Sequence, residues 1–134
     1  MANIADIEGI GPAYAEKLTA AGVKSLDDLL STGGSKSGRT GLAEKTGISE
    51  TLILEWVNRA DLARIKGVGS EYADLLEAAG VDSVPELAQR NAANLSAKMA
   101  EVNSAKNLVR SLPSETSVAD WIEQAKTMDR AVTH

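Results

Sequence analysis

The chain has 134 residues, and its 19 acidic and 14 basic side chains give a net charge of −5, the opposite sign from a protein that coats nucleic acid through bulk charge. It has no cysteine, and His134 is its only histidine, which excludes disulfides, thiolate or imidazole metal sites and histidine-based acid–base catalysis. We therefore expect no enzyme activity, metal, cofactor or small-molecule substrate. No apolar run approaches the roughly 20 residues of a membrane span, and Asp6 and Glu8 interrupt the segment where a signal peptide would be basic and then apolar, so we expect a cytoplasmic protein without membrane contacts.

A self-comparison of the sequence aligns residues 4–30 with residues 62–88 at one constant offset. All four aromatic residues of the chain belong to matched pairs, which favours core positions over stacking on bases. The alignment predicts an internal repeat, with a first lobe at residues 1–61 and a second at residues 62–134. The clearest matched pairs at this offset are Gly9 with Gly67, Gly11 with Gly69, Tyr14 with Tyr72, Leu18 with Leu76 and Gly22 with Gly80, and Trp56 matches Trp121 at an offset of 65.

The first repeat opens with a predicted helix at residues 12–21. Pro12 suits a first helical position, Tyr14 and Leu18 share an apolar stripe, and Gly22 is placed to end the helix. No alternating apolar stretch is long enough to predict a strand. The fold class predicted is therefore all-α, with about nine or ten short helices.

Short helices also follow two serines that occupy the same place in each repeat. Ser25 is followed three residues later by Asp28, and Ser83 is followed by Glu86 at the same spacing. A serine with an acidic residue at this spacing is typical of a capping box at a helix N-terminus. Both serines are therefore predicted to be N-caps.

Residues 33–40, with the sequence GGSKSGRT, fit the spacing of a phosphate-binding P-loop, except that Arg39 stands where a lysine belongs. A P-loop connects a strand to a helix, and no strand is predicted before it. We therefore interpret the segment as a flexible connector. Lys36 and Arg39 remain candidates for a secondary contact with a nucleic-acid backbone.

Residues 42–56 resemble a helix-turn-helix, with Gly47 at the turn. The face that would read bases carries Glu50 and Glu55, and carboxylates repel DNA phosphates. We therefore expect this segment to pack as ordinary structure.

The second repeat carries a longer insert. A helix is predicted from Asn91 or Ala92 to about residue 111, ended by Pro113. A final helix is predicted from Ser114 or Ser117 to about residue 128, with its apolar residues turned inward. Residues 130–134 are expected to fray.

Each repeat begins with an apolar-x-Gly-apolar-Gly motif ahead of a helix, at residues 7–11 and 65–69. The glycines allow a sharp turn that leaves amide groups unshielded where the helix starts, and free N–H groups and the helix dipole both favour a phosphate there. These residues resemble helix-hairpin-helix modules, which implies SAM-like helical lobes that hold a nucleic-acid backbone without sequence preference. Residues 9–30 and 41–50 also resemble the N-terminal helical domain of archaeal and eukaryotic RecA-type recombinases, and residues 4–128 resemble a bacterial family of unassigned function with two such units per chain.

Charge distinguishes the two hairpins. Asp6 and Glu8 precede the first, whereas Arg64 and Lys66 occupy the same positions before the second. Only the second flank attracts phosphate, so the nucleic-acid site is predicted there. The candidate contacts are Arg64, Lys66, Gly67, Val68, Gly69 and Ser70, with Lys36 and Arg39 as secondary contacts.

Two functions are compatible with this sequence. The first is weak, non-enzymatic binding of a nucleic-acid backbone, DNA before RNA, through the Gly-x-Gly hairpins. The alternative is a protein interaction or assembly module without nucleic-acid binding. In that case the acidic first hairpin of one molecule faces the basic second hairpin of another, so the partner is a different protein or a second copy.

Overall fold

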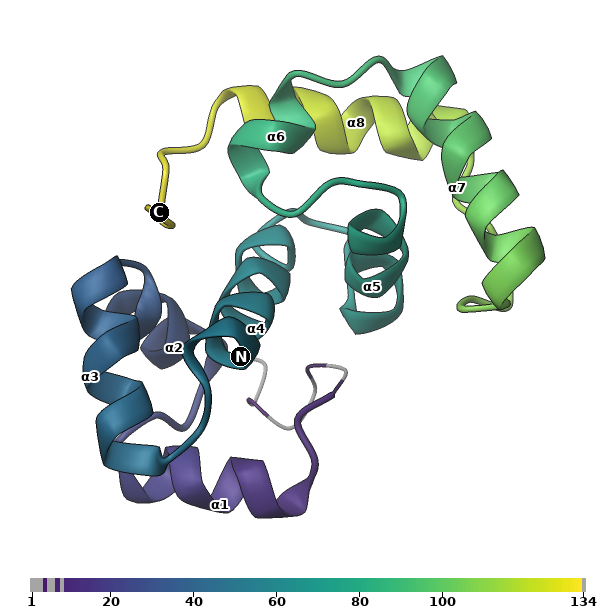
Figure 1. The fold of residues 1–134 in the computed structure, drawn as a ribbon. Helices are drawn as coiled ribbons and strands as arrows, with labels where there is room; N and C mark the ends of the chain where they lie inside the picture. Colours follow the sequence, from purple (N-terminus) through teal and green to yellow (C-terminus); the bar gives the residue numbers. More distant parts are fainter. Residues whose placement is uncertain (1–3, 5–6, 8, 134) are drawn as a thin grey trace. The chain divides into compact units, whose positions relative to one another are not determined.

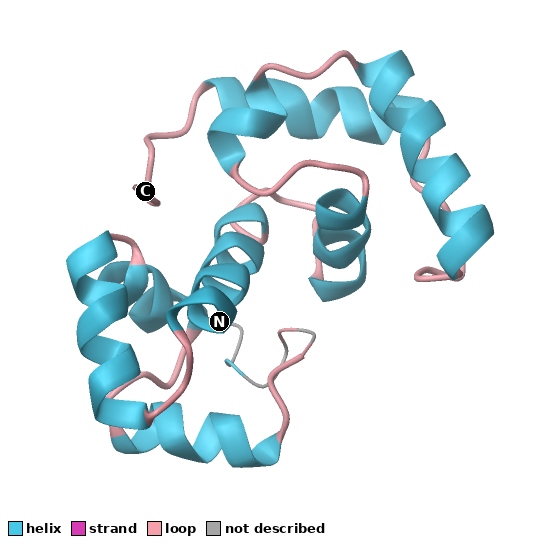
Figure 2. Cartoon of the chain, in the orientation of Figure 1, coloured by secondary structure: helices cyan, strands magenta, loops and turns pink. Residues whose placement is uncertain are grey.

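The computed structural model describes residues 4, 7 and 9–133, apart from the side chain of Ser70. Within these residues the protein is all-α: it forms eight helices, slightly fewer than predicted, and no strand (Figures 1 and 2). No helix in this part of the chain combines the length and the apolar character needed to cross a membrane. The helices are α1 (Pro12–Ala20), α2 (Leu26–Gly33), α3 (Lys36–Thr46), α4 (Glu50–Leu62), α5 (Ser70–Ala78), α6 (Val84–Ala88), α7 (Ala92–Lys106) and α8 (Glu115–Lys126).

The chain divides into two compact units. Unit 1 is Met1–Asp61 together with Ala131–His134, and unit 2 is Leu62–Arg130. Residues 131–133, predicted as part of a frayed end of the second lobe, instead belong to unit 1. Val132 is only 2% exposed in the core of that unit, and the backbone N–H of Thr133 donates to the carbonyl of Gly34 at 2.8 Å. Burial of an apolar side chain and main-chain hydrogen bonding hold this segment in place.

The core of unit 1 is built around Trp56, a fully buried residue of α4. Leu18 of α1, Leu29 of α2 and Leu42 of α3 are buried in the same cluster. The ring of Tyr14 packs against Trp56, with ring centroids 5.1 Å apart and planes at 58°, but Tyr14 remains 37% exposed. The prediction that all four aromatic residues are core residues is therefore wrong for Tyr14.

Unit 2 has an equivalent tryptophan, Trp121 of α8, which is 3% exposed. Tyr72 of α5 packs on it, with ring centroids 5.4 Å apart and planes at 47°. Helix α8 packs against α6 and α7 and buries one face of apolar residues, as predicted. The buried residues of that face are Val118, Trp121, Ile122 and Ala125.

The predicted capping box at the start of α2 is present. The hydroxyl of Ser25 accepts the backbone N–H of Asp28 at 3.1 Å. In return the Asp28 carboxylate accepts the N–H groups of Lys24 at 3.1 Å and Ser25 at 3.3 Å. The Lys24 amide, aided by Ser25, lowers the pKa of Asp28 below its ordinary value of 3.8, although desolvation opposes the shift.

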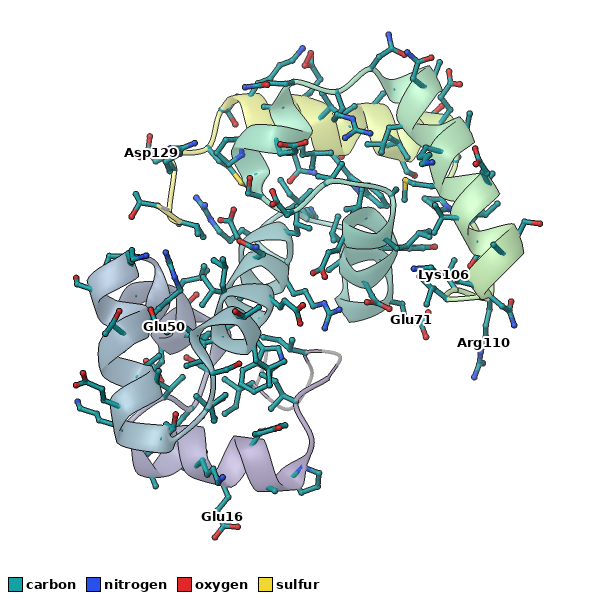
Figure 3. All side chains as sticks on the ribbon, in the orientation of Figure 1. Glu16, Glu50, Glu71, Lys106, Arg110 and Asp129 are labelled. Atoms are coloured by element: carbon teal, nitrogen blue, oxygen red, sulfur yellow. The ribbon has the colours of Figure 1, made fainter. Side chains whose placement is uncertain are left out.

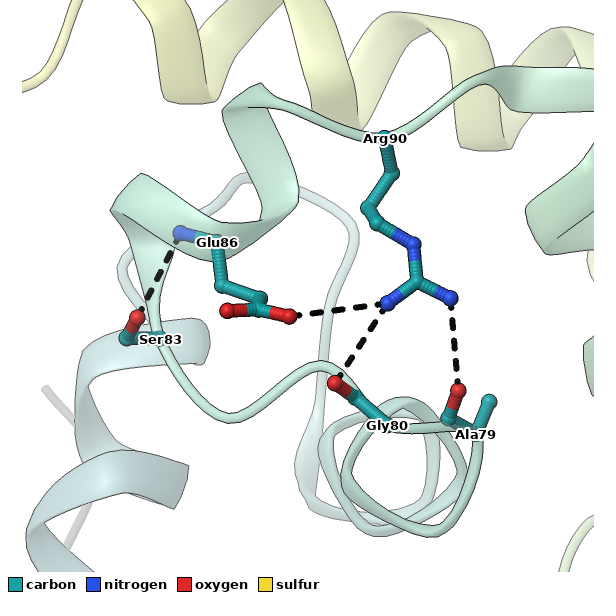
Figure 4. A network of polar contacts seen from close by, with 5 residues as sticks. All are labelled: Ala79, Gly80, Ser83, Glu86 and Arg90. Carbon is teal, nitrogen blue, oxygen red and sulfur yellow. Dashed lines mark hydrogen bonds and ion pairs between the residues drawn. The ribbon is translucent and has the colours of Figure 1, made fainter.

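In unit 2 the corresponding glutamate is used differently (Figure 4). Ser83 caps α6 by accepting the N–H of Glu86 at 3.4 Å, but the carboxylate of Glu86 lies 3.6 Å from Arg90. Arg90 in turn donates to the carbonyls of Ala79 and Gly80 at 3.4 Å each. A cation near these carbonyls, at the C-terminus of α5, is favoured by the helix dipole.

Helix α7 ends earlier than predicted, at Lys106 rather than near residue 111. Asn107 takes the left-handed conformation, with φ of 51°, and its N–H donates to the carbonyl of Asn103. The side-chain amide of Asn103 then holds both the N–H and the carbonyl of Val109, at 2.9 and 3.2 Å. Side-chain hydrogen bonds thus stabilise a loop where the apolar pattern predicts more helix.

Residues 33–40 form the junction between α2 and α3 and not the flexible connector predicted. Ser35 caps α3 by accepting the N–H of Gly38 at 3.1 Å. Gly38 is required by packing, because a Cβ there would collide with the carbonyl oxygen of Thr32. The glycines of this motif therefore serve tight packing of the backbone.

Candidate nucleic-acid interface

The hairpin of unit 2 consists of two consecutive turns before α5. The N–H of Ile65 donates to the carbonyl of Leu62, and the N–H of Val68 donates to the carbonyl of Ile65, each at 3.1 Å. Ile65 and Val68 are 1% and 5% exposed, so they fix the hairpin to the core. Val68, a predicted contact residue, thus has a buried side chain and can offer a ligand only its backbone.

The indole of Trp121 packs against the hairpin at Gly67. Gly67 has φ of +99°, and a Cβ at this position would lie 2.9 Å from Nε1 of the indole. Both the backbone conformation and the close approach disfavour any side chain at position 67. The turn is therefore held rigidly on the tryptophan.

The side chain of Lys66 is exposed to solvent, but its backbone N–H and carbonyl already form hydrogen bonds. Gln124 of α8 accepts the N–H of Lys66 at 2.9 Å and donates to its carbonyl at 3.1 Å. The Gln124 amide also donates to the carboxylate of Asp120 at 2.9 Å. Lys66 can therefore contact an anion only with its ammonium group, and the nearby Asp120 weakens the local positive potential.

A hollow of ≈ 720 Å³ lies beside this hairpin. It is bounded by Lys66 and Gly67 on the hairpin and by the first turns of α8. Thr116 and Ser117 contribute hydroxyl groups and Asp120 a carboxylate. The hollow has mixed charge, which does not favour a small anion within it.

The N-terminus of α5 has no side-chain cap. Its N-cap is Gly69, in extended conformation, and the first intrahelical bond runs from the N–H of Ala73 to the carbonyl of Gly69 at 2.9 Å. Within the described part of the chain, only α1 and α5 start this way; a serine or asparagine side chain caps each of the other six helices. These caps are Ser25, Ser35, Ser49, Ser83, Asn91 and Ser114.

The N-terminus of α1 differs from that of α5 in one respect that bears on anion binding. Its N-cap is Gly11 and its first residue is Pro12, which has no N–H to donate. Helix α5 has Ser70 in that place and so offers one more amide; the Ser70 side chain lies outside the described residues. Asp6 and Glu8, on which the charge contrast between the hairpins depends, also lie outside the described part.

Arg64 is held in unit 2 by its own contacts. The side chain is partly buried, and Nη2 donates to the carbonyl of Asp129 at 2.9 Å. This bond ties the hairpin to the segment after α8. Arg64 therefore adds positive potential near Lys66 while serving a structural role.

The two secondary candidates lie in unit 1 and are not equivalent. Lys36 is exposed at the start of α3. Arg39 is 4% exposed and donates from Nη1 to the carbonyls of Gly33 and Gly34, each at 3.0 Å. Its Nη2 donates to the carbonyl of Thr133 at 2.7 Å. Arg39 as a phosphate contact is therefore a wrong prediction, because its guanidinium is buried and satisfied by backbone carbonyls.

Two basic residues that the sequence analysis does not single out lie near the N-terminus of α5. The hydroxyl of Tyr72 donates to the carbonyl of Ser111 at 3.0 Å, which holds the loop after α7 against the first turn of α5. Lys106 and Arg110 are exposed on this part of unit 2, as is Glu71 of α5 (Figure 3). No local sequence signal marks them, because they come near α5 only through the path of α7 and the contact of Tyr72 with Ser111.

The fold and this hairpin define an all-α protein with an uncapped helix start set on a rigid glycine turn. The chain belongs to the family described as "Domain of unknown function (DUF4332)", whose model matches residues 8–128. No curated protein and no solved structure matches the chain.

Proposed function

We propose that the protein binds the backbone of nucleic acid, without sequence preference, at the N-terminus of α5. The observation that carries this proposal is the missing cap. Where six helices satisfy an N-terminal amide with a serine or asparagine oxygen, α5 leaves this to solvent or a ligand. Free amides at the positive end of a helix dipole are a favourable place for a phosphate oxygen.

Exposed cations of unit 2 support a polymeric ligand. Lys66 lies on the hairpin before α5, Lys106 is the last residue of α7, and Arg110 lies on the loop that Tyr72 holds against α5. Consecutive phosphates of a nucleic-acid strand could pair with such separated cations. Because Glu71 and Asp120 oppose them, we expect weak binding, with a salt dependence that corresponds to roughly 2–4 phosphates.

We further propose that the two units are helix-hairpin-helix lobes that arose by internal repetition, similar to the accessory domain of RecA-type recombinases. Support comes from matched backbone geometry: φ is +94° at Gly9 and +99° at Gly67, and +91° at Gly22 and +97° at Gly80. The tyrosine–tryptophan distances of 5.1 and 5.4 Å also agree. Nucleic-acid binding is then expected at the hairpin of unit 2, because α5 starts with Ser70, which has a backbone N–H, whereas α1 starts with Pro12, which has none.

The test is a titration of fluorescent duplex and single-stranded oligonucleotides, DNA and RNA, at low and high salt. Lys66→Glu and the pair Lys106→Glu with Arg110→Glu should each weaken binding at least several-fold. Lys45→Glu, at an exposed position of α3 in unit 1, is the control for the change in net charge and should have a smaller effect. Equal loss from Lys45→Glu, or no binding at low salt, would contradict the proposal and favour the protein-interaction alternative.

Ser70→Pro isolates the amide itself. Proline is favoured at the first helical position, and it would give α5 the Gly-Pro start that α1 already has, so the fold should be retained. We expect weaker binding at unchanged thermal stability. Unchanged affinity would show that the first amide of α5 does not contact the ligand.

A further inference from the structure

The second feature of interest lies in unit 1, where residues 131–133 dock as an extended segment. The contacts are to its backbone at Thr133, whose N–H donates to Gly34 at 2.8 Å and whose carbonyl accepts from Arg39 at 2.7 Å. One side chain, Val132, is buried in the core. Backbone pairing together with one apolar pocket is a common way to bind a peptide.

The GGSKSGRT motif builds the receiving side of this contact. Arg39 donates to Gly33 and Gly34 with one nitrogen and to the docked segment with the other, so a single guanidinium joins the two. A Cβ on Gly34 would collide with the carbonyl oxygen of Ala131. Glycine at this position is therefore what allows the segment to approach.

The docked segment does not fill the surface around it. A hollow of ≈ 560 Å³ adjoins Ala131 and Thr133 and is also lined by Leu30 and Gly34. Asp27, Ser31 and Ser35 give it a polar edge. The site is thus an open groove, from which a short segment can leave without unfolding the surrounding helices.

The path of the chain favours exchange of this segment. The carbonyl of Asp129 is held by Arg64 within unit 2, and the segment that docks in unit 1 starts at Ala131. Only Arg130 lies between the two attachments. A short connection between two anchored parts favours domain swapping, in which a second copy supplies the same element.

We propose that the groove formed by Gly33, Gly34 and Arg39 is a peptide-docking site, and that it accepts residues 131–133 of a second copy in exchange for the chain's own. Attached to its own chain, the segment is present at an effective concentration on the order of millimolar, which favours the closed monomer in dilute solution. Exchange between copies therefore becomes measurable as the protein concentration approaches this range. This inference is independent of nucleic-acid binding.

The test combines two full-length variants that lack complementary halves of the contact. Val132→Asp leaves the groove intact but cannot bury its segment, and Arg39→Met keeps the segment but removes the guanidinium. In isotope-labelled Val132→Asp, the amide signals of Gly33 and Gly34 should shift from their wild-type positions. Adding unlabelled Arg39→Met should return them toward those positions, and the average mass in sedimentation should rise; adding unlabelled Val132→Asp should do neither.

Two results with these variants would overturn the proposal. Wild-type signals for Gly33 and Gly34 in Val132→Asp would mean that the segment is not docked. No response to Arg39→Met at about millimolar concentration would mean that a second copy does not supply it. If Val132→Asp fails to fold, Thr133→Pro replaces it, since that change removes the N–H and hydroxyl donors to the carbonyl of Gly34. Mixed labelled and unlabelled wild-type protein offers a test without mutation: Thr133 of one copy should show a nuclear Overhauser contact to Gly34 of another, and its absence would reject exchange.

Discussion

Unit 1 and unit 2 set a glycine turn on a tryptophan in closely similar ways, but they complete their cores with different parts of the chain. Unit 2 uses the inserted helix α7 and the loop that Tyr72 holds. Unit 1 has no such insert and buries Val132 from the other end of the chain. The turn and its tryptophan are tightly constrained by backbone geometry, whereas the outer parts of each core need only supply apolar volume and backbone hydrogen bonds.

The largest effect should come from removing either tryptophan. Trp56→Ala and Trp121→Ala should each lower the free energy of unfolding by about 3–5 kcal/mol, as for other large buried aromatic residues. Denaturant unfolding followed by circular dichroism measures this loss. Native fluorescence of the two single-tryptophan variants should be blue-shifted and poorly quenched. Red-shifted, freely quenched emission from one variant would show that the tryptophan of that unit is exposed, unlike the tryptophan of the other unit.

Substitutions in the glycine turns should lower the free energy of unfolding less than loss of a tryptophan, and by different amounts in the two units. Gly9→Ala and Gly67→Ala each force alanine into a left-handed conformation, which costs about 1–3 kcal/mol. Gly67→Ala should lie at the upper end, because its Cβ would meet the rigid Trp121 ring at 2.9 Å. The new Cβ at Gly9 would instead lie nearest, at 3.2 Å, to the flexible end of Arg59.

Gly69→Ala is the matched control for this comparison. Its Cβ would meet nothing within 4 Å and its φ is negative, so stability should change little or rise slightly. Thermal unfolding of the three variants gives the ranking. Equal losses at Gly9 and Gly67 would show that backbone strain alone, and not contact with tryptophan, sets the cost.

The two serine caps should give a smaller effect. Ser25→Ala and Ser83→Ala should each cost about 1 kcal/mol in the free energy of unfolding, since each hydroxyl accepts one amide at a helix start. Hydrogen exchange at Asp28 and Glu86 should report the loss in each unit separately. Slower exchange at either amide would be inconsistent with the cap.

The smallest effect is a difference in acid response between the units. The pKa of Asp28 is lowered in the folded protein, so its contribution to stability is present above the ordinary value of 3.8 and is lost as the pH falls through the folded pKa. In Asp28→Asn, the stability of unit 1 should depend less on pH in this acidic range. Parallel pH profiles for wild type and Asp28→Asn would contradict this assignment.

Much of the fold follows from local signals in the sequence. Ser25, Ser83 and Ser114 mark helix starts because a short hydroxyl side chain satisfies an amide of the next turn, and that bond is local. The burial of Trp56 and Trp121 likewise follows from their apolar neighbours. Lys66 could be predicted as an exposed cation beside the hairpin.

The errors arise where contacts distant in sequence decide the outcome. Arg39 is predicted to be a surface cation, yet its shortest hydrogen bond joins it to Thr133. Val132 is predicted to belong to a frayed end, because no local sequence pattern indicates that the core of unit 1 buries it. Leu108 and Val109 continue the apolar period of α7, but the left-handed Asn107 and the side-chain bonds of Asn103 end the helix before them.

The docking of residues 131–133 also fixes an order of events during synthesis. The ribosome makes the first 61 residues of unit 1 before any of unit 2, but Val132 emerges only after all of unit 2. Domains commonly fold in the order in which they are made. Unit 1 therefore lacks Val132 in its core until unit 2 has been synthesised. Unit 2, although it is translated second, is the first unit that can fold completely.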